Sequence, residues 1–423
     1  MSSLDSITLN NFELARFLLA IVFLLFIAHL VGYLFHKFKL PKVIGEIIGG
    51  LLAGPTVFGF FLPEIHNSLF NAFEYEGKLI SMVYWLGLIL LMFVSGFETK
   101  KFFIKKNKNI IIYILLGATI FPFIAGWIIT LIFDFSPYLG IKNNMLALQI
   151  IVSIAVAVTS IPVISRIFID LNIIKTRFAR IILGTATFQD IILWIGLAIA
   201  TGLVNTQILP LSNIFSVVII TILFFLISLL LMPKIIGLLN HSKYNFFIKN
   251  SVSGYALFIC LLFTVIASLL NVNIVFGAFL AGIVIGLMPE ELFEKEKKWI
   301  KEISLGLFVP LYFAIVGLKL DLIHHFDVVF FLGFLLFSTT VETIGTFIAA
   351  KLAKKDRLTS FNLAIAMNTR GGPGIVLATV AFEIGIINES FFVTLVIVAI
   401  ITSLIAGYWL KYVLSKGWHL YKD

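Results

Sequence analysis

Charged residues are scarce in this sequence, and their scarcity limits what the protein can be. Asp, Glu, Lys and Arg make up 13% of the 423 residues, whereas hydrophobic residues make up 60%. A soluble domain has about 25% charged residues, so this chain has too little polar surface for a soluble globule of its size. The composition predicts an integral, multi-pass membrane protein surrounded by membrane lipids.

Cysteine is almost absent, since Cys260 is the only one and lies inside an apolar run. A single cysteine excludes an intrachain disulfide and a cysteine-based metal site. A cleavable signal peptide is not expected either, because residues 1–14 carry acids and little base and the first apolar run is too long. No cofactor is predicted.

Apolar runs dominate what is present, and thirteen of them predict membrane helices. The predicted fold class is therefore all-α and polytopic. The runs lie near residues 15–35, 41–62, 79–97, 109–133, 144–169, 180–205, 211–236, 253–270, 273–289, 303–320, 328–351, 359–385 and 390–412.

The basic residues give the chain a formal net charge of +9, but they are grouped in loops after alternate runs. That grouping is the orientation signal of membrane loops and disfavours a nucleic-acid partner. The positive-inside rule places the N-terminus outside and the C-terminus in the cytoplasm, in what we expect to be the cell (inner) membrane. The clusters lie at residues 37–42, 100–108, 175–180, 234–249, 295–301, 351–357 and 411–422.

An internal repeat is visible in the glycines. Because seven runs, an odd number, separate the matching stretches, the first six and last six runs are predicted to be inverted repeats joined by the seventh. Such repeats are typical of secondary transporters, although similar glycine spacing also occurs in ordinary helix packing. At one constant offset, Gly45, Gly50 and Gly54 match Gly277, Gly282 and Gly286, and Gly96 corresponds more weakly to Gly317.

The fifth and twelfth runs are predicted to be broken in mid-membrane. Proline removes a backbone donor, and glycines and hydroxyls suit an unwound segment whose carbonyls can face an ion. The alternative is a proline-kinked packing helix without a site. The break residues are Thr159, Ser160 and Pro162 in the fifth run and Asn368, Arg370, Gly371, Gly372 and Pro373 in the twelfth.

Three charges are predicted near the bilayer midplane. Asp190 lies ten residues past Arg180, which places it about 15 Å into a hydrocarbon layer about 30 Å thick. Glu342 and Arg370 lie at similar depth in the eleventh and twelfth runs. Because an isolated charge is costly there, Glu342 and Arg370 are predicted to pair, which leaves Asp190 able to exchange a proton for a cation.

Five motifs occur in order along the chain: LPKVIGEIIGGLLAGP at 40–55, Gly96-Phe97-Glu98, Thr159-Ser160, Phe188-Gln189-Asp190 and Asn368-Thr369-Arg370-Gly371. Together they resemble the monovalent cation:proton antiporter-2 family, and the resemblance covers essentially the whole chain. It implies the sodium/proton-antiporter fold. Many relatives carry a second aspartate where this chain has Gln189, and many carry a lysine near the position of Glu342.

The resemblance also implies a division of the chain and a homodimer. The expected dimer-domain parts are residues 1–108 and 251–325, the transport-core parts are residues 109–205 and 326–423, and residues 206–250 hold the linker helix. A separate regulatory subunit is not identified by the sequence.

The resulting prediction is a cation:proton antiporter, not an enzyme, that works by alternating access. Asp190 is predicted to bind H⁺ and Na⁺ or K⁺ in turn, and Gln189, Thr159 and Ser160 to supply neutral oxygens, which hard cations prefer. Since Gln189 cannot titrate, the exchange is predicted to be electroneutral, one for one.

Two other classes remain as alternatives. A passive or gated K⁺ channel-like efflux protein could use the same residues, but no ring of charges or carbonyl-filter motif is visible. A polytopic membrane enzyme is disfavoured, because no nucleophile and base or metal cluster accompanies the acids.

Overall fold

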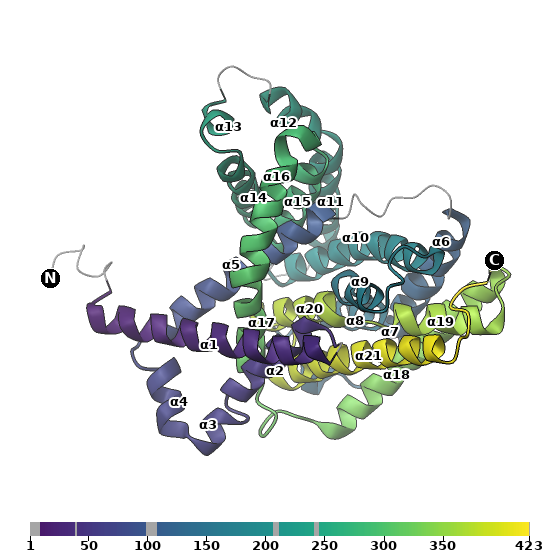
Figure 1. The fold of residues 1–423 in the computed structure, drawn as a ribbon, viewed down its shortest axis with the longest axis horizontal. Coiled ribbons are helices and arrows are strands. Elements are labelled where there is room, and N and C mark those ends of the chain that lie inside the picture. Colours follow the sequence, from purple (N-terminus) through teal and green to yellow (C-terminus); the bar gives the residue numbers. More distant parts are fainter. Residues whose placement is uncertain (1–8, 39, 99–107, 206–210, 241–244, 423) are drawn as a thin grey trace. The chain divides into compact units, whose positions relative to one another are not determined.

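The computed structural model describes residues 9–38, 40–98, 108–205, 211–240 and 245–422 (Figure 1). This part of the chain is built from helices and their connections, and its only β-pairing is an isolated bridge between Leu139 and Ile387. The predicted all-α class is therefore confirmed. The chain divides into two compact units, which are Met1–Leu91 with Lys301–His324 and Met92–Ile300 with His325–Asp423.

The first unit is organised around the glycine-rich helix α2. This helix (Lys42–Ala53) crosses α17 (Val309–Leu318) so closely that two glycines leave no room for a side chain. A Cβ at Gly50 of α2 would overlap the backbone of Ala314, and a Cβ at Gly317 of α17 would overlap the backbone of Ile47. Small residues at such crossings let membrane helices approach closely. The helices of this unit are α1 (Asn11–Lys37), α2 (Lys42–Ala53), α3 (Phe58–Phe61), α4 (Pro63–Phe70), the first part of α5 (Glu76–Glu98), the π-helix η5 (Ser304–Phe308) and α17 (Val309–Leu318).

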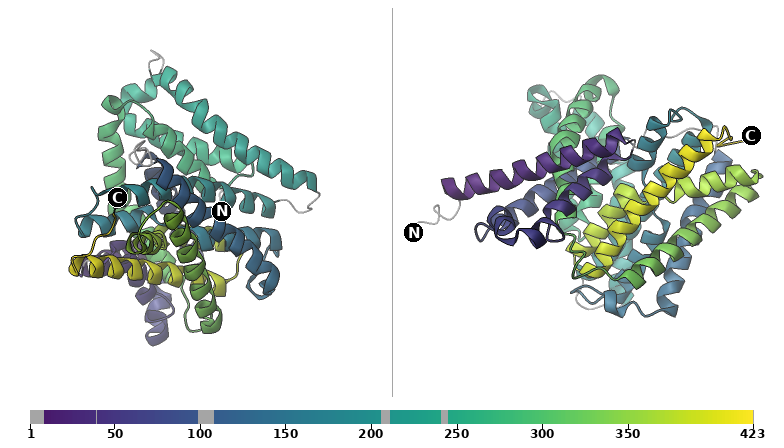
Figure 2. Two further views of the ribbon diagram at one scale, coloured as in Figure 1. Left: turned by 90° about the vertical axis from the view of Figure 1, so that its right-hand side faces the viewer. Right: turned by 60° about the horizontal axis from the view of Figure 1, so that its bottom comes forward.

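The second unit holds most of the helices. Its C-terminal helices α18 to α21 pack together (Figure 2). The elements are α6 (Lys108–Leu115), the π-helix η3 (Leu116–Ile120), α7 (Phe121–Ile132), the 3₁₀-helix η4 (Ser136–Tyr138), α8 (Met145–Ala157), α9 (Ile161–Asp170), α10 (Arg177–Asn205), α11 (Leu211–Leu230), α12 (Met232–Asn240), α13 (Phe246–Asn250), α14 (Val252–Leu269), α15 (Ile274–Gly286), α16 (Glu290–Ile303), α18 (Val328–Leu352), α19 (Arg357–Met367), α20 (Gly371–Glu383) and α21 (Glu389–Ser415).

Ten helices among the described residues are long and apolar enough to cross a membrane. They overlap ten of the thirteen predicted runs. The other three predicted runs contain shorter helices: α8 and α9 in the fifth, α15 in the ninth, and α19 and α20 in the twelfth. The total of thirteen crossings therefore stays a prediction.

One predicted loop is wrong. The basic stretch at 295–301 is part of helix α16, which continues through η5 into α17 as one candidate span. Phe293 and Ile300 are buried seven residues apart on one face, while five glutamates and four lysines make up most of the rest of the helix. Charge density suggested a loop, but an apolar stripe at helical spacing is sufficient for an amphipathic helix. The predicted basic residues at 39, 100–107 and 243 lie outside the described residues.

Candidate functional site

The two predicted helix breaks meet inside the second unit. The first lies between α8 and α9 and the second between α19 and α20, and Ser160 N donates a hydrogen bond of 2.5 Å to Thr369 O. Ser160 Oγ accepts from Val163 N at 3.3 Å and from Gly372 N at 3.1 Å. One serine hydroxyl therefore satisfies unpaired N–H groups at the start of α9 and of α20, which is the role of an N-cap.

The chain geometry at the second break requires glycine. Gly371 begins α20 with φ +32°, and a Cβ there would also overlap the side chain of Val163. This conformation is accessible to glycine at little cost. Pro373 follows within the first turn of α20. In the first break, Pro162 is in the first turn of α9, and the structure describes its backbone but not its side chain.

The side chains of Arg370 and Glu342, which were predicted to pair, are in contact. Arg370 Nη2 lies 2.9 Å from Glu342 Oε2, with side-chain exposures of 3% and 0%. Arg370 Nη2 also donates to Ser338 O, one turn earlier on α18, at 3.0 Å. The contact joins the second break to α18, and a buried pair with further hydrogen bonds is the geometry in which such charges are tolerated.

Arg370 also closes the end of α8. Its Nε donates to Ala155 O at 3.1 Å, its Nη2 to Val156 O at 3.1 Å, and its Nη1 to Asn368 Oδ1 at 2.9 Å. The last carbonyls of a helix lack helical partners and carry negative partial charge, so a guanidinium is a favourable partner there. The side chain of Asn368 is held in turn by a hydrogen bond of 2.8 Å that its Nδ2 donates to Thr343 Oγ1.

Thr159 also belongs to this network of contacts. Its hydroxyl lies 2.6 Å from Met367 O and 3.3 Å from Glu342 Oε1. Because a hydroxyl has one hydrogen, it donates to one of these acceptors at a time. Thr159, Ser160, Asn368, Glu342 and Arg370 together link the two breaks, and we call these five residues the brace.

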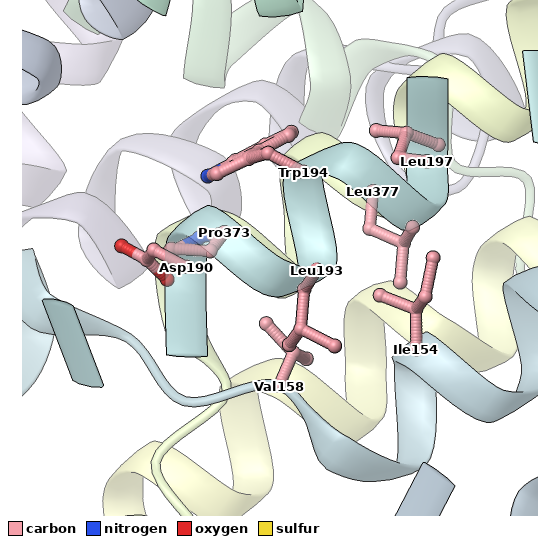
Figure 3. A pocket seen from close by; sticks show the side chains of 8 residues that line it. All are labelled: Ile154, Val158, Asp190, Leu193, Trp194, Leu197, Pro373 and Leu377. Carbon is pink, nitrogen blue, oxygen red and sulfur yellow. The ribbon is translucent and has the colours of Figure 1, made fainter. Parts of the chain in front are cut away.

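Asp190 lies apart from these contacts, on α10. It is 6% exposed, and within the described part of the chain its Oδ1 has no hydrogen-bond partner. It lines an apolar pocket with Val158 of the first break and Pro373 of the second. Figure 3 shows Asp190, Pro373 and Trp194 on one side of this pocket. The other lining residues are Ile154, Leu193, Leu197 and Leu377.

Gln189 is fixed by two main-chain carbonyls. Its Nε2 donates to Ala118 O at 2.8 Å and also to Ala157 O. Ala118 lies in the π-helix η3, and Ala157 is the last residue of α8. With both amide hydrogens used in this way, Oε1 is left buried and without a hydrogen-bond partner among the described residues.

The predicted site residues therefore separate into two groups. The brace joins the breaks, while Asp190 and Gln189 each have a buried oxygen without a donor in the described part of the chain. The sequence reasoning missed Trp194, although it follows Asp190 by four residues and so shares its helix face. It also missed the carbonyl of Ala118, for which the sequence carried no signal. No group of three or more His, Cys, Asp or Glu residues that could hold a metal occurs in the described ranges.

Comparison with known proteins gives a consistent result. A family model described as sodium/hydrogen exchanger, transmembrane, matches residues 22–416. The Na⁺/H⁺-K⁺ antiporter GerN of Bacillus cereus is 28% identical over 406 residues, covering 94% of this chain and 96% of that protein. The K⁺/H⁺ antiporter 1 of Saccharomyces cerevisiae is also 28% identical, over 94% of this chain but 46% of that longer protein. The solved structure of the sodium proton antiporter MjNhaP1 from Methanocaldococcus jannaschii matches with a TM-score of 0.68 and 16% identity, covering 96% of this chain and 99% of that one, and it shows the fold.

Proposed function

This chain belongs to the sodium/hydrogen exchanger family, and we propose that it is a secondary antiporter that exchanges Na⁺ or K⁺ for H⁺ by alternating access. A family of membrane transporters fits the ten apolar helices and gives no support to an enzyme. The names of its relatives include Na⁺ and K⁺ antiporters, so both cations belong to the proposal.

The burial of Asp190 without a hydrogen-bond donor to Oδ1 among the described residues is the observation that carries the proposal. The side chain of Asp190 is buried at the edge of an apolar pocket. A bare carboxylate in such surroundings is costly, so the group is stable when it holds either a proton or a cation. Because one carboxyl cannot hold both, binding of the cation displaces the proton, and this competition couples the two fluxes.

We assign the cation ligands to Asp190 and Gln189. Gln189 Oε1 is a buried neutral oxygen without a donor among the described residues, which is the kind of ligand a partly dehydrated Na⁺ or K⁺ requires. The Thr159 hydroxyl donates to Met367 O, and Ser160 Oγ accepts from Gly372 N. We propose a positioning role for these two residues in this conformation, and the ligand role predicted from the sequence stays a prediction.

The same arrangement supports an exchange of one proton for one cation. Gln189 cannot titrate, and Glu342 is held by Arg370 at 2.9 Å. Asp190 is then the group that changes protonation during the cycle. One positive charge moves in each direction, so no net charge crosses the membrane.

Many transporters that work by alternating access are built from inverted repeats, and the glycine contacts support such a repeat here. Gly50 of α2 packs on α17, and its counterpart Gly282 of α15 packs on α5. Gly45 of α2 packs on α1, and its counterpart Gly277 of α15 packs on α14. In the proposed repeat α1 corresponds to α14 and α5 to α17, so matching glycines contact matching helices, as a symmetry of the fold requires.

The remaining parts of the proposal follow the sequence. We propose a homodimer formed through the dimer-domain parts at 1–108 and 251–325, with the transport core at 109–205 and 326–423. We also propose that the chain lies in the cell membrane, with the N-terminus outside and the C-terminus in the cytoplasm, as the placement of basic residues predicts.

Proton movement in proteoliposomes tests the antiport. With a pH-sensitive dye inside the vesicles, addition of Na⁺ or K⁺ outside is expected to drive protons out, because each cation that enters replaces a proton on Asp190. Clamping the membrane potential must leave this proton signal unchanged. A channel-like efflux protein would move the cation without protons once the potential is clamped, and that result would reject the antiporter.

A further inference from the structure

The pocket beside Asp190 is very small. The space that it leaves for the centre of a water-sized sphere is about 10 Å³, which is close to the smallest cavity that holds one water molecule. Of the eight lining residues that the structure describes, Asp190 alone has a side-chain oxygen (Figure 3). A cation with a full shell of water molecules cannot enter this space, so a cation that reaches Asp190 here has lost most of its water.

Trp194 has the largest side chain in the lining of this pocket. It follows Asp190 by four residues on α10, so the two side chains lie on one face of the helix, and it is 5% exposed. The other lining residues of α10 are the smaller Leu193 and Leu197. Shortening Trp194 would therefore free more volume than shortening any of the others.

The indole of Trp194 packs on the ring of Phe279, which belongs to α15. The two ring centroids are 6.2 Å apart with an interplanar angle of 39°, and Phe279 is 1% exposed. Aromatic rings at this separation attract each other beyond the burial of their surface. The contact therefore holds the indole in its place beside Asp190.

The helix that carries Phe279 is itself held by two neighbours. A Cβ at Gly282 would lie 2.2 Å from Phe93 O of α5, and a Cβ at Gly277 would lie 2.7 Å from Phe263 O of α14. Small residues have already brought these backbones into contact, so α15 cannot move closer to either helix. Phe279 is therefore a fixed support.

The two helix breaks supply further fixed residues of the pocket. Val158 is the C-cap of α8 and is 3% exposed, and Arg370 Nη2 donates to the nearby Val156 O at 3.1 Å. Pro373 lies in the first turn of α20, where its ring restricts the backbone. In this conformation the size of the side chains, and not a loose backbone, determines how much space remains beside Asp190.

We infer that Trp194 sets an upper size limit on the transported cation, so that Asp190 accepts alkali cations no larger than a water molecule. The inference rests on the proposed antiport and names the cations that it takes. Bare Na⁺ is smaller than a water molecule and bare K⁺ is about as large, whereas Rb⁺ and Cs⁺ are increasingly larger. A closely packed site with fixed boundaries disfavours even a small excess of volume.

The test uses two variants of graded size in the full chain. Trp194→Phe keeps an aromatic ring against Phe279 but is smaller, and Trp194→Leu removes the ring. Because the surroundings of a shortened core side chain relax only in part, each variant adds space beside Asp190. Trp127→Leu is the matched control, since Trp127 is a partly exposed tryptophan of α7 that does not line the pocket.

Two measurements are made with Na⁺, K⁺, Rb⁺ and Cs⁺ in turn. The first is cation-driven proton movement in proteoliposomes, and the second is the melting temperature in detergent with each cation as its chloride salt. A ligand that binds only the folded state raises the melting temperature, so the second measurement reports binding without transport. It also shows whether each variant is folded.

The unmodified protein and Trp127→Leu should move protons with Na⁺ and K⁺ at least about tenfold faster than with Cs⁺, the discrimination that a small difference in fit provides. The rate with Cs⁺ relative to Na⁺ should rise about tenfold in Trp194→Leu and by a smaller factor in Trp194→Phe. Cs⁺ should raise the melting temperature of Trp194→Leu but not that of the unmodified protein. Adding Asp190→Asn to Trp194→Leu should remove this effect of Cs⁺.

The inference is wrong if both Trp194 variants slow every cation in the same proportion, because Trp194 would then be a packing residue. It is also wrong if the unmodified protein exchanges Cs⁺ as fast as Na⁺. If no cation moves protons in any variant, while Cs⁺ stabilises Trp194→Leu alone and only when Asp190 is present, the antiport proposal has failed and the size limit at Asp190 stands.

Discussion

Asp190→Asn is expected to remove both proton and cation exchange while leaving the protein folded. The amide cannot take up or release a proton and carries no charge to hold a monovalent cation. The substitution should not lower the melting temperature, because Oδ1 of the aspartate has no donor among the described residues and an uncharged side chain suits the apolar pocket better. Proton movement on addition of Na⁺ or K⁺ to proteoliposomes should fall to the level of empty vesicles.

Asp134→Asn serves as the control for this substitution. Asp134 lies after α7, outside the spanning helices, and hydrogen bonds from Ser136 hold the pKa of its carboxyl below the ordinary value. This variant should exchange at the unmodified rate. If Asp190→Asn retains cation-driven proton movement, Asp190 is not the shared site.

Glu342→Gln and Arg370→Gln are each expected to lower the free energy of unfolding by about 3–5 kcal/mol, because either change leaves one buried charge without its partner. The loss should be larger for Arg370→Gln, since it also removes the donors to Ala155 O and Ser338 O. The double variant should recover part of the summed loss. Chemical unfolding in detergent measures all three.

The partly exposed pair of Arg166 and Asp170 provides the comparison for this cycle. These side chains lie 3.1 Å apart at i and i+4 on α9, with exposures of 37% and 14%. Asp170→Asn should cost no more than about 1 kcal/mol. Strictly additive losses for Glu342 and Arg370 would show that the two charges are energetically independent, and Glu342 would then be a second candidate proton carrier.

The positions of the two breaks could be predicted from local sequence. Proline, glycine and hydroxyl residues mark interruptions through backbone chemistry that acts within a few residues. The midplane depth of Asp190 rests on its distance along an apolar run and the rise of a helix, and it stays a prediction. These predictions need no knowledge of which helices are neighbours.

The partners of the break residues could not be predicted in the same way. Thr159 reaches Met367 O, 208 residues away, and Arg370 reaches Ala155 O, 215 residues away. Residue type predicted oxygen ligands, whereas the hydrogen bonds that the Thr159 and Ser160 hydroxyls make to the other break depend on the tertiary structure. Only the helix packing decides whether a hydroxyl faces a cation or a neighbouring backbone.

Helix α16 shows a different limit of the sequence argument. A high density of charge suggested a loop, because charge is costly within a membrane. The helix forms because Phe293 and Ile300 lie on one buried face, and its charges need only a polar environment on the other. Charge density predicts exposure to a polar environment, which a helix satisfies as well as a loop.

The most direct test of the central claim, that one carboxyl exchanges one proton for one cation, is the ratio of the two fluxes measured together. Proton and cation movements are recorded in the same proteoliposomes with the membrane potential clamped at zero and at −100 mV. The proposal predicts one proton for each Na⁺ or K⁺ at both potentials and an equilibrium cation distribution that does not depend on voltage. A second transported charge would couple to the potential by about 2.3 kcal/mol per 100 mV. A cation distribution that shifts with voltage would therefore contradict the account and point to a second titrating group.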